Sequence, residues 1–244
     1  MYNDKIKELR NKISEANSLY RTGNPIMSDD EFDELLDSLY ELSPNDNLLN
    51  LIGYDIKNNS RKSKLPIPMA SMNKVKNVTE LKKWEISKKI DKDEIVIITP
   101  KYDGLSLCVN ESNKKDAYTR GNGEYGQKSN THYEKIDNKL STNINDISYS
   151  IGEVIMPKYT FNDKYSDNYS NSRNLVSGLL NSDKASDMLM DCHYIKYNAI
   201  LATEDRFITK QQILDYLNNN QEHKVKYKIY KLSDLTDEIL ISLY

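Results

Sequence analysis

The residues with the clearest chemical potential follow a β-branched run near the middle of the chain. Residues 95–99 are typical of a buried strand, Pro100 ends it, and Lys101, Asp103 and Gly104 follow in the sequence KYDG. A lysine that a strand holds near a low-dielectric interior can lose its proton and act as a nucleophile. The same four residues also fit a surface turn with a solvated lysine, so this short pattern leaves both interpretations open.

Two arginines and one glutamate occupy further positions from which a side chain could contact a ligand. Residues 120–127, RGNGEYGQ, form a glycine-dense turn that begins with Arg120. Such a backbone can approach a phosphate closely, although a hairpin turn has the same composition. Glu153 lies in an otherwise apolar predicted strand, where a carboxylate needs a lysine, a ligand hydroxyl or a metal as its partner. Arg173 lies near the start of a short helix predicted over residues 171–178.

The hydrophobic pattern predicts the elements that must position these residues. Residues 4–20 and a second run that starts at Ser28 repeat apolar positions every three or four residues, so two amphipathic helices should form an N-terminal hairpin. Ser28 and the glutamate three residues later have the spacing of a capping box. In the second helix, Asp29, Phe32 and Asp33 also fit an ordinary acidic helix start and a core residue. The other predicted elements are helices over 79–90, 209–217 and 233–243 and strands over 105–109, 114–120, 148–156, 191–200 and 224–231.

Length and composition limit the class of protein. The 244 residues, 38% of them hydrophobic, suffice for one large domain or for one medium domain with an appendage. A net charge of −3 argues against a stand-alone nucleic-acid binder. Cys108 and Cys192 lack metal-ligand spacing and fit free thiols in a reducing compartment. Neither a signal peptide nor a membrane span is visible, so we expect a soluble cytoplasmic protein with no membrane partner.

Taken in order, the motifs resemble those of the N-terminal part of the NAD-dependent DNA ligases. The chain carries MSDDEFDELLDSLYEL, PMASM, KYDG, TRGNGEYGQ, GEV and NSRNLVSGLL, where the family has SDAEYD-like, PMLSL-like, KxDG, TRGDGxxGE, RGEV and NPRNAAAGSLR segments. The resemblance covers nearly the whole chain. It implies an α+β fold, in which a nucleotidyltransferase (ATP-grasp-like) adenylation domain with antiparallel sheets occupies residues 51–244. A helical hairpin over residues 1–50, which binds the nicotinamide mononucleotide half of NAD, would precede it.

The resemblance also implies a reaction. In the family, the lysine of KxDG attacks the α-phosphate of NAD, releases nicotinamide mononucleotide and carries AMP, which then passes to the 5′-phosphate of nicked double-stranded DNA. Lys101 would be this nucleophile, and Asp103 would orient it or the DNA end. Mg2+ is implied by the phosphate chemistry, whereas no protein metal ligands are expected. The positions expected to bind the cofactor are Tyr20, Asp29, Phe32, Asp33, Ser71, Met72, Thr99, Arg120, Glu153, Arg173 and Tyr194.

Several of these positions carry specific expected roles by motif match. Arg173 would contact the phosphate or the nucleotide, Glu153 the ribose, and Tyr194 would stack on the base. Ser71 and Met72 would line the adenine pocket. The four hairpin residues would grip the nicotinamide half.

The chain also departs from the family pattern. Thr99 stands where the family usually has a glutamate that reads the adenine amino group, and Ile151 and Asn181 replace arginines. Phe32 replaces the usual tyrosine of the hairpin. Each lost charge or donor could cost roughly 1–3 kcal/mol if its partner were left buried and unpaired. These departures put the affinity for NAD in question and leave the nucleophile intact.

Two strands that follow in the family, resembling DGxVxK and WAxAyKF, are not found in the sequence before Tyr244. We therefore expect one subunit of a split, phage-type ligase, acting in the host cytoplasm if the source is viral. A second subunit would supply the strands and the DNA-binding modules, and an excised or degenerate fragment is the alternative. A non-catalytic nucleotide-binding or scaffold protein and an adenylating enzyme with another acceptor are the competing functions.

Overall fold

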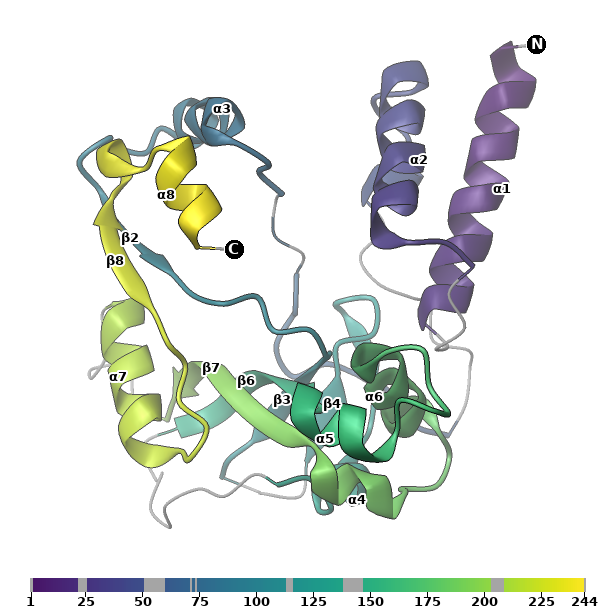
Figure 1. Cartoon of the computed structure of the whole chain (residues 1–244), viewed down its shortest axis with the longest axis vertical. Coiled ribbons are helices and arrows are strands. Elements are labelled where there is room, and N and C mark those ends of the chain that lie inside the picture. The colour runs from purple at the N-terminus through teal and green to yellow at the C-terminus, as the bar shows by residue number, and fades with distance from the viewer. Residues whose placement is uncertain are drawn as a thin grey trace.

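The computed structural model describes residues 2–21, 26–50, 60–70, 72, 74–112, 116–137, 147–202 and 209–243. Within these ranges it has a helical hairpin, a central four-stranded antiparallel sheet and two smaller two-stranded sheets (Figure 1). The predicted α+β class with antiparallel sheets and N-terminal helices is confirmed. None of the helices in the described ranges is long and apolar enough to cross a bilayer.

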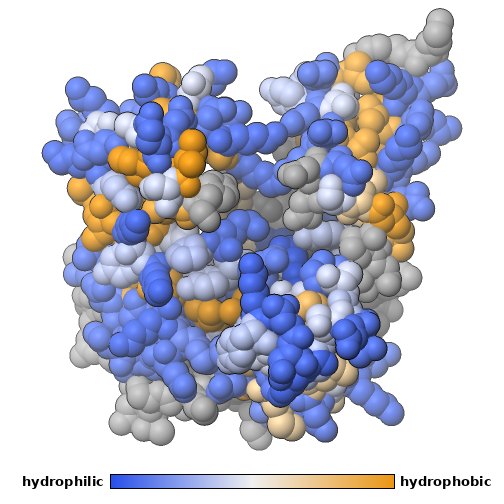
Figure 2. All heavy atoms as spheres, in the orientation of Figure 1, coloured by the Kyte–Doolittle hydropathy of each residue, from blue (hydrophilic) through white to orange (hydrophobic). Residues whose placement is uncertain are grey.

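The hairpin consists of α1 (Tyr2–Arg21) and α2 (Asp29–Leu42), followed by the 3-10 turn η1 (Asn47–Asn50). The predicted capping box is present, because the Ser28 hydroxyl accepts from the Glu31 amide and the Glu31 carboxylate accepts from the Ser28 amide. The two helices enclose their own apolar cluster, in which Leu9, Ile13 and Leu39 are buried. Figure 2 shows a largely hydrophilic face on which apolar residues gather over the hairpin and over the region of α8.

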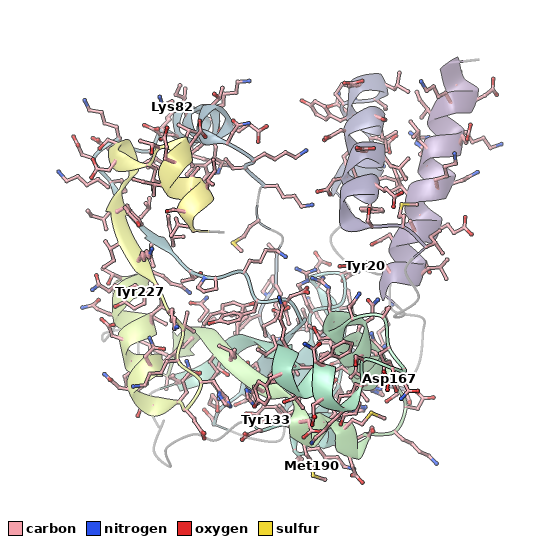
Figure 3. All side chains as sticks on the ribbon, in the orientation of Figure 1. Tyr20, Lys82, Tyr133, Asp167, Met190 and Tyr227 are labelled. Carbon is pink, nitrogen blue, oxygen red and sulfur yellow. The ribbon has the colours of Figure 1, made fainter. Side chains whose placement is uncertain are left out.

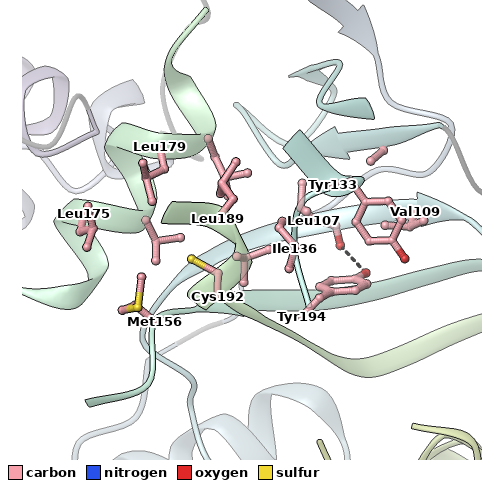
Figure 4. Packing of buried hydrophobic residues seen from close by; sticks show 14 of the residues in the cluster. Leu107, Val109, Tyr133, Ile136, Met156, Leu175, Leu179, Leu189, Cys192 and Tyr194 are labelled. Atoms are coloured by element: carbon pink, nitrogen blue, oxygen red, sulfur yellow. Dashed lines mark hydrogen bonds between the residues drawn. The ribbon is translucent and has the colours of Figure 1, made fainter. Parts of the chain in front are cut away.

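The central sheet has the order β4-β3-β6-β7, with all neighbours antiparallel. One face packs against helices and buries the main hydrophobic core, which includes Leu107, Val154, Leu175 and Tyr194 (Figure 4). The strands are β3 (Leu105–Asn110), β4 (Ala117–Thr119), β6 (Ile147–Ile155) and β7 (His193–Leu201). The elements beside that core are α4 (Asn130–Tyr133), α5 (Lys158–Lys164), α6 (Ser172–Asn181) and the 3-10 turn η2 (Asp187–Asp191).

The strand before the KYDG motif differs from the prediction. β2 (Ile95–Ile98) pairs with β8 (Lys228–Lys231) in a separate two-stranded sheet, and Ile95 is 53% exposed. The β-branched run is therefore a half-exposed strand and not a buried central one. α3 (Val78–Lys88) and α8 (Asp237–Ser242) lie near this small sheet (Figure 1), and the Val78 amide donates to the Asp237 carboxylate at 2.9 Å.

The PMASM stretch and the glycine-rich turn lie against each other. β1 (Lys62–Lys64) pairs with β5 (Tyr125–Gln127), and the Met69 amide donates to the Gly123 carbonyl at 2.9 Å. The Asn122 side chain accepts from the amides of residues 124 and 125, which closes the turn. Residues 120–127 could be interpreted as a loop that approaches a phosphate or as a hairpin turn. The structure shows a turn between β4 and β5.

The C-terminal elements differ from prediction at their ends. α7 (Lys210–Asn220) begins with a capping box at Thr209, close to its predicted start. The last helix begins at Asp237 and is capped by Thr236, because residues before it form the 3-10 turn η3 (Leu232–Asp234). The short elements β1, α4, α5 and η2 lack a pattern long enough to predict.

Candidate functional site

The side of the central sheet opposite the main core carries the polar residues of interest. Directly paired residues of antiparallel strands share a face. Ser106 of β3 pairs with Glu153 of β6, and Glu153 pairs with Ile195 of β7, so these three side chains share one face. Val154 and Tyr194 pair on the other face, within the main core.

Three basic side chains converge on Glu153. The Ser106 hydroxyl donates to the Glu153 carboxylate at 2.8 Å. Burial raises the pKa of Glu153, and the Ser106 hydrogen bond together with the charges of Arg173, Arg120 and Lys101 opposes that rise. The three cations come from different places in the chain: just before β3, just after β4 and the first turn of α6. The fold therefore brings the charges of three predicted site residues to bear on a fourth, Glu153.

Arg173 connects the KYDG motif to the helical hairpin. Its Nη1 lies 3.0 Å from Oδ1 of Asp103, and its guanidinium lies 5.2 Å from the centre of the Tyr20 ring. Figure 3 shows Tyr20 near the foot of α1, above α6. The Asn171 side chain accepts from the Asn174 amide at 2.8 Å and caps α6, which fixes the turn that carries Arg173.

Lys101 is exposed to solvent. This agrees with the interpretation of KYDG as a surface turn with a solvated lysine, and not with a lysine buried beside a strand. The glycine of the motif has a steric role. A Cβ on Gly104 would lie 1.9 Å from the Val154 carbonyl oxygen of β6, so only glycine lets the chain pass this close to the sheet and enter β3. Although Lys101 is exposed, its charge acts on Glu153 and opposes the rise in the pKa of that carboxyl.

Tyr194 does not occupy the position expected of a base-stacking residue. It is 2% exposed, and its hydroxyl donates to the Leu107 carbonyl at 3.1 Å, the dashed line in Figure 4. Its ring meets the Tyr133 ring edge-on, with centroids 5.7 Å apart. A Cβ on Gly152 would lie 2.6 Å from the Tyr194 ring, so this ring packs directly over the glycine. Tyr194 therefore points into the core, on the face of the sheet opposite Glu153.

Tyr197 is the β7 aromatic residue beside the polar cluster, and the sequence prediction omitted it. Burial raises the pKa of Tyr197 to about 12, the nearby charge of Glu153 adds to the rise, and Ser106 and Arg120 oppose it. Tyr197 lies where the pairing of β6 with β7 shifts register, between Ile151 and the next residue. Successive side chains of a strand point to opposite faces of the sheet. Because Tyr194 and Tyr197 are an odd number of residues apart, this alternation was the signal in the sequence that they face opposite sides.

The two methionines of the PMASM stretch differ in exposure. Met72 is 92% exposed, whereas Met69 is buried against Leu65 and Cys108. The expected contact of Met72 with adenine stays a prediction. Ser71 and the side chain of Asp29 lie outside the described residues. Thr99 is half-buried just beyond β2.

The hairpin residues have partners within the chain. Both carboxylate oxygens of Asp33 accept from Lys74, at 2.6 and 2.8 Å, and Lys76 lies 3.0 Å from Asp37. Phe32 packs against the hairpin core, as the core interpretation of that position expected. These pairs join α2 to the segment that leads into α3, a connection that no motif indicated.

Comparison with known proteins gives a consistent result. Residues 57–242 match the NAD-dependent DNA ligase adenylation domain. The chain is 34% identical over 239 residues to the DNA ligase of Acanthamoeba polyphaga mimivirus, which covers 93% of this chain and 35% of that protein. It is 34% identical over 250 residues to putative DNA ligase 205R of Invertebrate iridescent virus 6, covering 99% and 37% respectively. Against the DNA ligase of Shewanella baltica it is 29% identical over 192 residues, covering 75% and 29%.

Proposed function

The chain belongs to the family of NAD-dependent DNA ligase adenylation domains, and on this premise we propose that Lys101 takes AMP from NAD. The uncharged amine of Lys101 attacks the α-phosphorus, a nitrogen–phosphorus bond forms, and nicotinamide mononucleotide leaves with the electrons of the broken phosphoanhydride bond. The amine proton passes to solvent, to which Lys101 is exposed. The observations that carry the proposal are the Arg173–Asp103 ion pair at 3.0 Å, in which Asp103 belongs to the KYDG motif, and the action of the Lys101, Arg120 and Arg173 charges on Glu153.

This face fits a dinucleotide. Arg120 and Arg173 supply positive charge where a diphosphate would need it, and fixed cations stabilise the charge of a phosphoryl-transfer transition state. Glu153, held by Ser106, can accept a hydrogen bond from a ribose hydroxyl. Tyr197, in place of Tyr194, presents the aromatic ring for the base.

The Arg173–Asp103 ion pair gives Asp103 a positioning role. Its carboxylate fixes Arg173 while Lys101 lies two residues away in the same turn. Asp103 is also 67% exposed and so is the carboxylate of this site most open to a hydrated Mg2+. Bound there, the ion would neutralise phosphate charge.

The helical hairpin over residues 1–50 is proposed to bind the nicotinamide half through Tyr20, Asp29, Phe32 and Asp33. The contact between Tyr20 and Arg173 supports this, because it brings the end of α1 beside the proposed phosphate site. The Lys74 ammonium forms an ion pair with the Asp33 carboxylate. A ligand that binds Asp33 must therefore displace Lys74 or contact both side chains.

Transfer of AMP to the 5′-phosphate of nicked DNA, and sealing of the nick, are also proposed. The chain spans 35% and 37% of the length of the two viral relatives. We propose that a second ligase subunit supplies DNA-binding parts for these steps. Nick-sealing assays with and without a candidate second polypeptide test this part separately.

The deciding experiment is the intact mass of the protein after incubation with NAD and Mg2+. The wild type should gain one AMP, and Lys101→Ala should gain none. Lys82→Ala, which removes an exposed lysine from α3, is the matched control and should gain AMP as the wild type does. AMP attachment by Lys101→Ala at the wild-type level would overturn the assignment.

The second candidate function is a non-catalytic nucleotide-binding or scaffold protein. Thr99, Ile151 and Asn181, which depart from the family pattern, favour it. In the structure Ile151 packs beside Leu65 and Met69, and the Asn181 amide donates to Ser177, so both have structural partners. This alternative predicts NAD binding by calorimetry without any gain in mass, even when the second subunit is present.

A further inference from the structure

Asp137, His193 and His223 form a cluster that the proposed reaction does not use. Asp137 follows α4, His193 is the first residue of β7, and His223 lies between α7 and β8. Their candidate ligand atoms all lie within 4.8 Å of one another. The chain has three histidines, and two of them meet here.

The backbone fixes two of the three residues beside each other. Asp137 and His193 form a parallel bridge, in which the Asp137 amide donates to the Cys192 carbonyl at 3.0 Å and the Tyr194 amide donates to the Asp137 carbonyl at 3.2 Å. The spacing of these side chains is therefore set by the sheet and needs no ligand to establish it.

The loop that carries His223 is also held in place. The Gln221 side chain bonds both backbone groups of Lys196, at 3.1 and 2.9 Å. Beyond the histidine, the Asn218 side chain bonds both backbone groups of Val225, at 2.9 and 2.8 Å. His223 thus projects toward β7 from a loop that is fixed on both sides.

One ring nitrogen of His223 has no hydrogen-bond partner among the residues that the structure describes. Its ring stacks on the His193 ring with centroids 3.8 Å apart and planes within 8°. Its Nε2 is buried and makes no hydrogen bond to any described residue, because the nearest carboxylate oxygen, on Asp137, is 3.8 Å away. A buried nitrogen beside a second imidazole and a carboxylate is an available metal ligand.

We propose that Asp137, His193 and His223 bind a divalent transition-metal ion of the Zn2+ class. Two imidazole nitrogens and one carboxylate oxygen suit Zn2+ or Co2+, whereas Mg2+ prefers an all-oxygen set. Side-chain exposures of 20% for His223 and 23% for Asp137 leave room for water as a fourth ligand.

Binding requires a small movement of the two rings. Ligand atoms around a tetrahedral Zn2+ lie about 3.3 Å apart, given bonds of about 2.0–2.1 Å. The lone pair of an imidazole lies in the plane of its ring, so two stacked rings must tilt apart to point at one ion. The ion would then join the loop between α7 and β8 to the central sheet. β8 pairs with β2, and β2 leads to the turn that carries Lys101. By fixing the loop before β8, the ion would therefore also stabilise the strand pair that leads to this turn.

The test is calorimetric titration of tag-free, chelator-treated protein with Zn2+, followed by the absorption spectrum with Co2+. The wild type should bind one ion and unfold at a higher temperature in its presence. His223→Gln, in the loop, and His193→Ala should each weaken binding by more than about 100-fold, since outer-shell partners alone contribute 10–100-fold. Asp187→Asn, an exposed acid outside the cluster, is the matched control and should bind as the wild type does.

The Co2+ spectrum separates this site from the cysteines. Cys108 and Cys192 are both buried, and neither belongs to the cluster of Asp137, His193 and His223, so an ion bound there should show no thiolate band. Circular dichroism establishes that each variant is folded before its titration is interpreted. Wild-type protein that binds no Zn2+, wild-type affinity in His223→Gln, or a thiolate band would each overturn the proposal.

Discussion

The placement of the two β7 tyrosines on different sides of the central sheet can be tested by a pair of substitutions. Tyr197 lies beside Ser106, Glu153 and Arg120, whereas Tyr194 lies in the core. Stacking of a base on an aromatic ring is worth about 1–3 kcal/mol. Tyr197→Ala should therefore raise the Kd for NAD about 5- to 150-fold. Because Tyr197 also packs against the cluster of Ile195, Leu214 and Val225, the Kd of this variant for NAD is measured at a temperature where the variant is folded.

Tyr194→Phe should show the opposite result. The Tyr194 hydroxyl donates to Leu107 at 3.1 Å and lies 3.2 Å from the Ser150 hydroxyl, with the residue 2% exposed. Removing a buried hydrogen-bonding group and leaving its partners unsatisfied costs about 1–3 kcal/mol. In a chain of this length that lowers Tm by roughly 2–12 °C. The Kd for NAD should stay at its wild-type value at a temperature where the variant is folded.

Calorimetric titration with NAD and thermal unfolding supply the two measurements for each variant. Tyr197→Phe is the matched control, because it keeps the ring, loses the hydroxyl, and should retain NAD affinity. Loss of NAD affinity in Tyr194→Phe with normal affinity in Tyr197→Ala would refute the reasoning, since the base would then lie on the core face.

Two further predictions concern β6, the strand that pairs with β7. Burial raises the pKa of Glu153, so the native protein retains this proton at pH values where the unfolded chain has lost it. As the pH rises from 4.5 through the raised pKa, the free energy of unfolding of the wild type should therefore fall relative to that of Glu153→Gln. If the wild type instead lost stability relative to Glu153→Gln as the pH was lowered, this prediction would be contradicted. Gly152→Ala should lower Tm, because its Cβ would lie 2.3 Å from the Ile195 carbonyl oxygen. Gly178→Ala, whose Cβ meets nothing within 4 Å, is the control in α6, and equal Tm values for the two variants would contradict the steric argument.

Local features of the fold followed from the sequence. The capping box at Ser28 and the helix start at Thr209 depend on residues three positions apart, so the sequence contains all the necessary information. The β-branched run before Lys101 did form a strand. Its surroundings were predicted wrongly, because an apolar run does not reveal which strand it will pair with, and its partner is β8, near the other end of the chain.

The geometry of the site depends on such distant pairings. The motifs identified Asp103 and Arg173 one by one, but only the fold brings them within 3.0 Å of each other. Alternation along β7 could have shown that Tyr194 and Tyr197 differ in direction. Choosing between them required the register with Glu153, which no local pattern contains. The spacing of Asp137, His193 and His223 follows no metal-ligand motif for the same reason.

Arg173 is the residue on which these distant contacts depend most. Its guanidinium pairs with Asp103 through one nitrogen and lies over the Tyr20 ring, so it touches both the turn of Lys101 and the hairpin. A guanidinium has five N–H donors in a planar fork, and the contact with Asp103 uses Nη1. Arg173 can therefore donate hydrogen bonds to a phosphate while Nη1 still donates to Asp103. A lysine at this position would keep the charge but could not make both contacts with the same geometry.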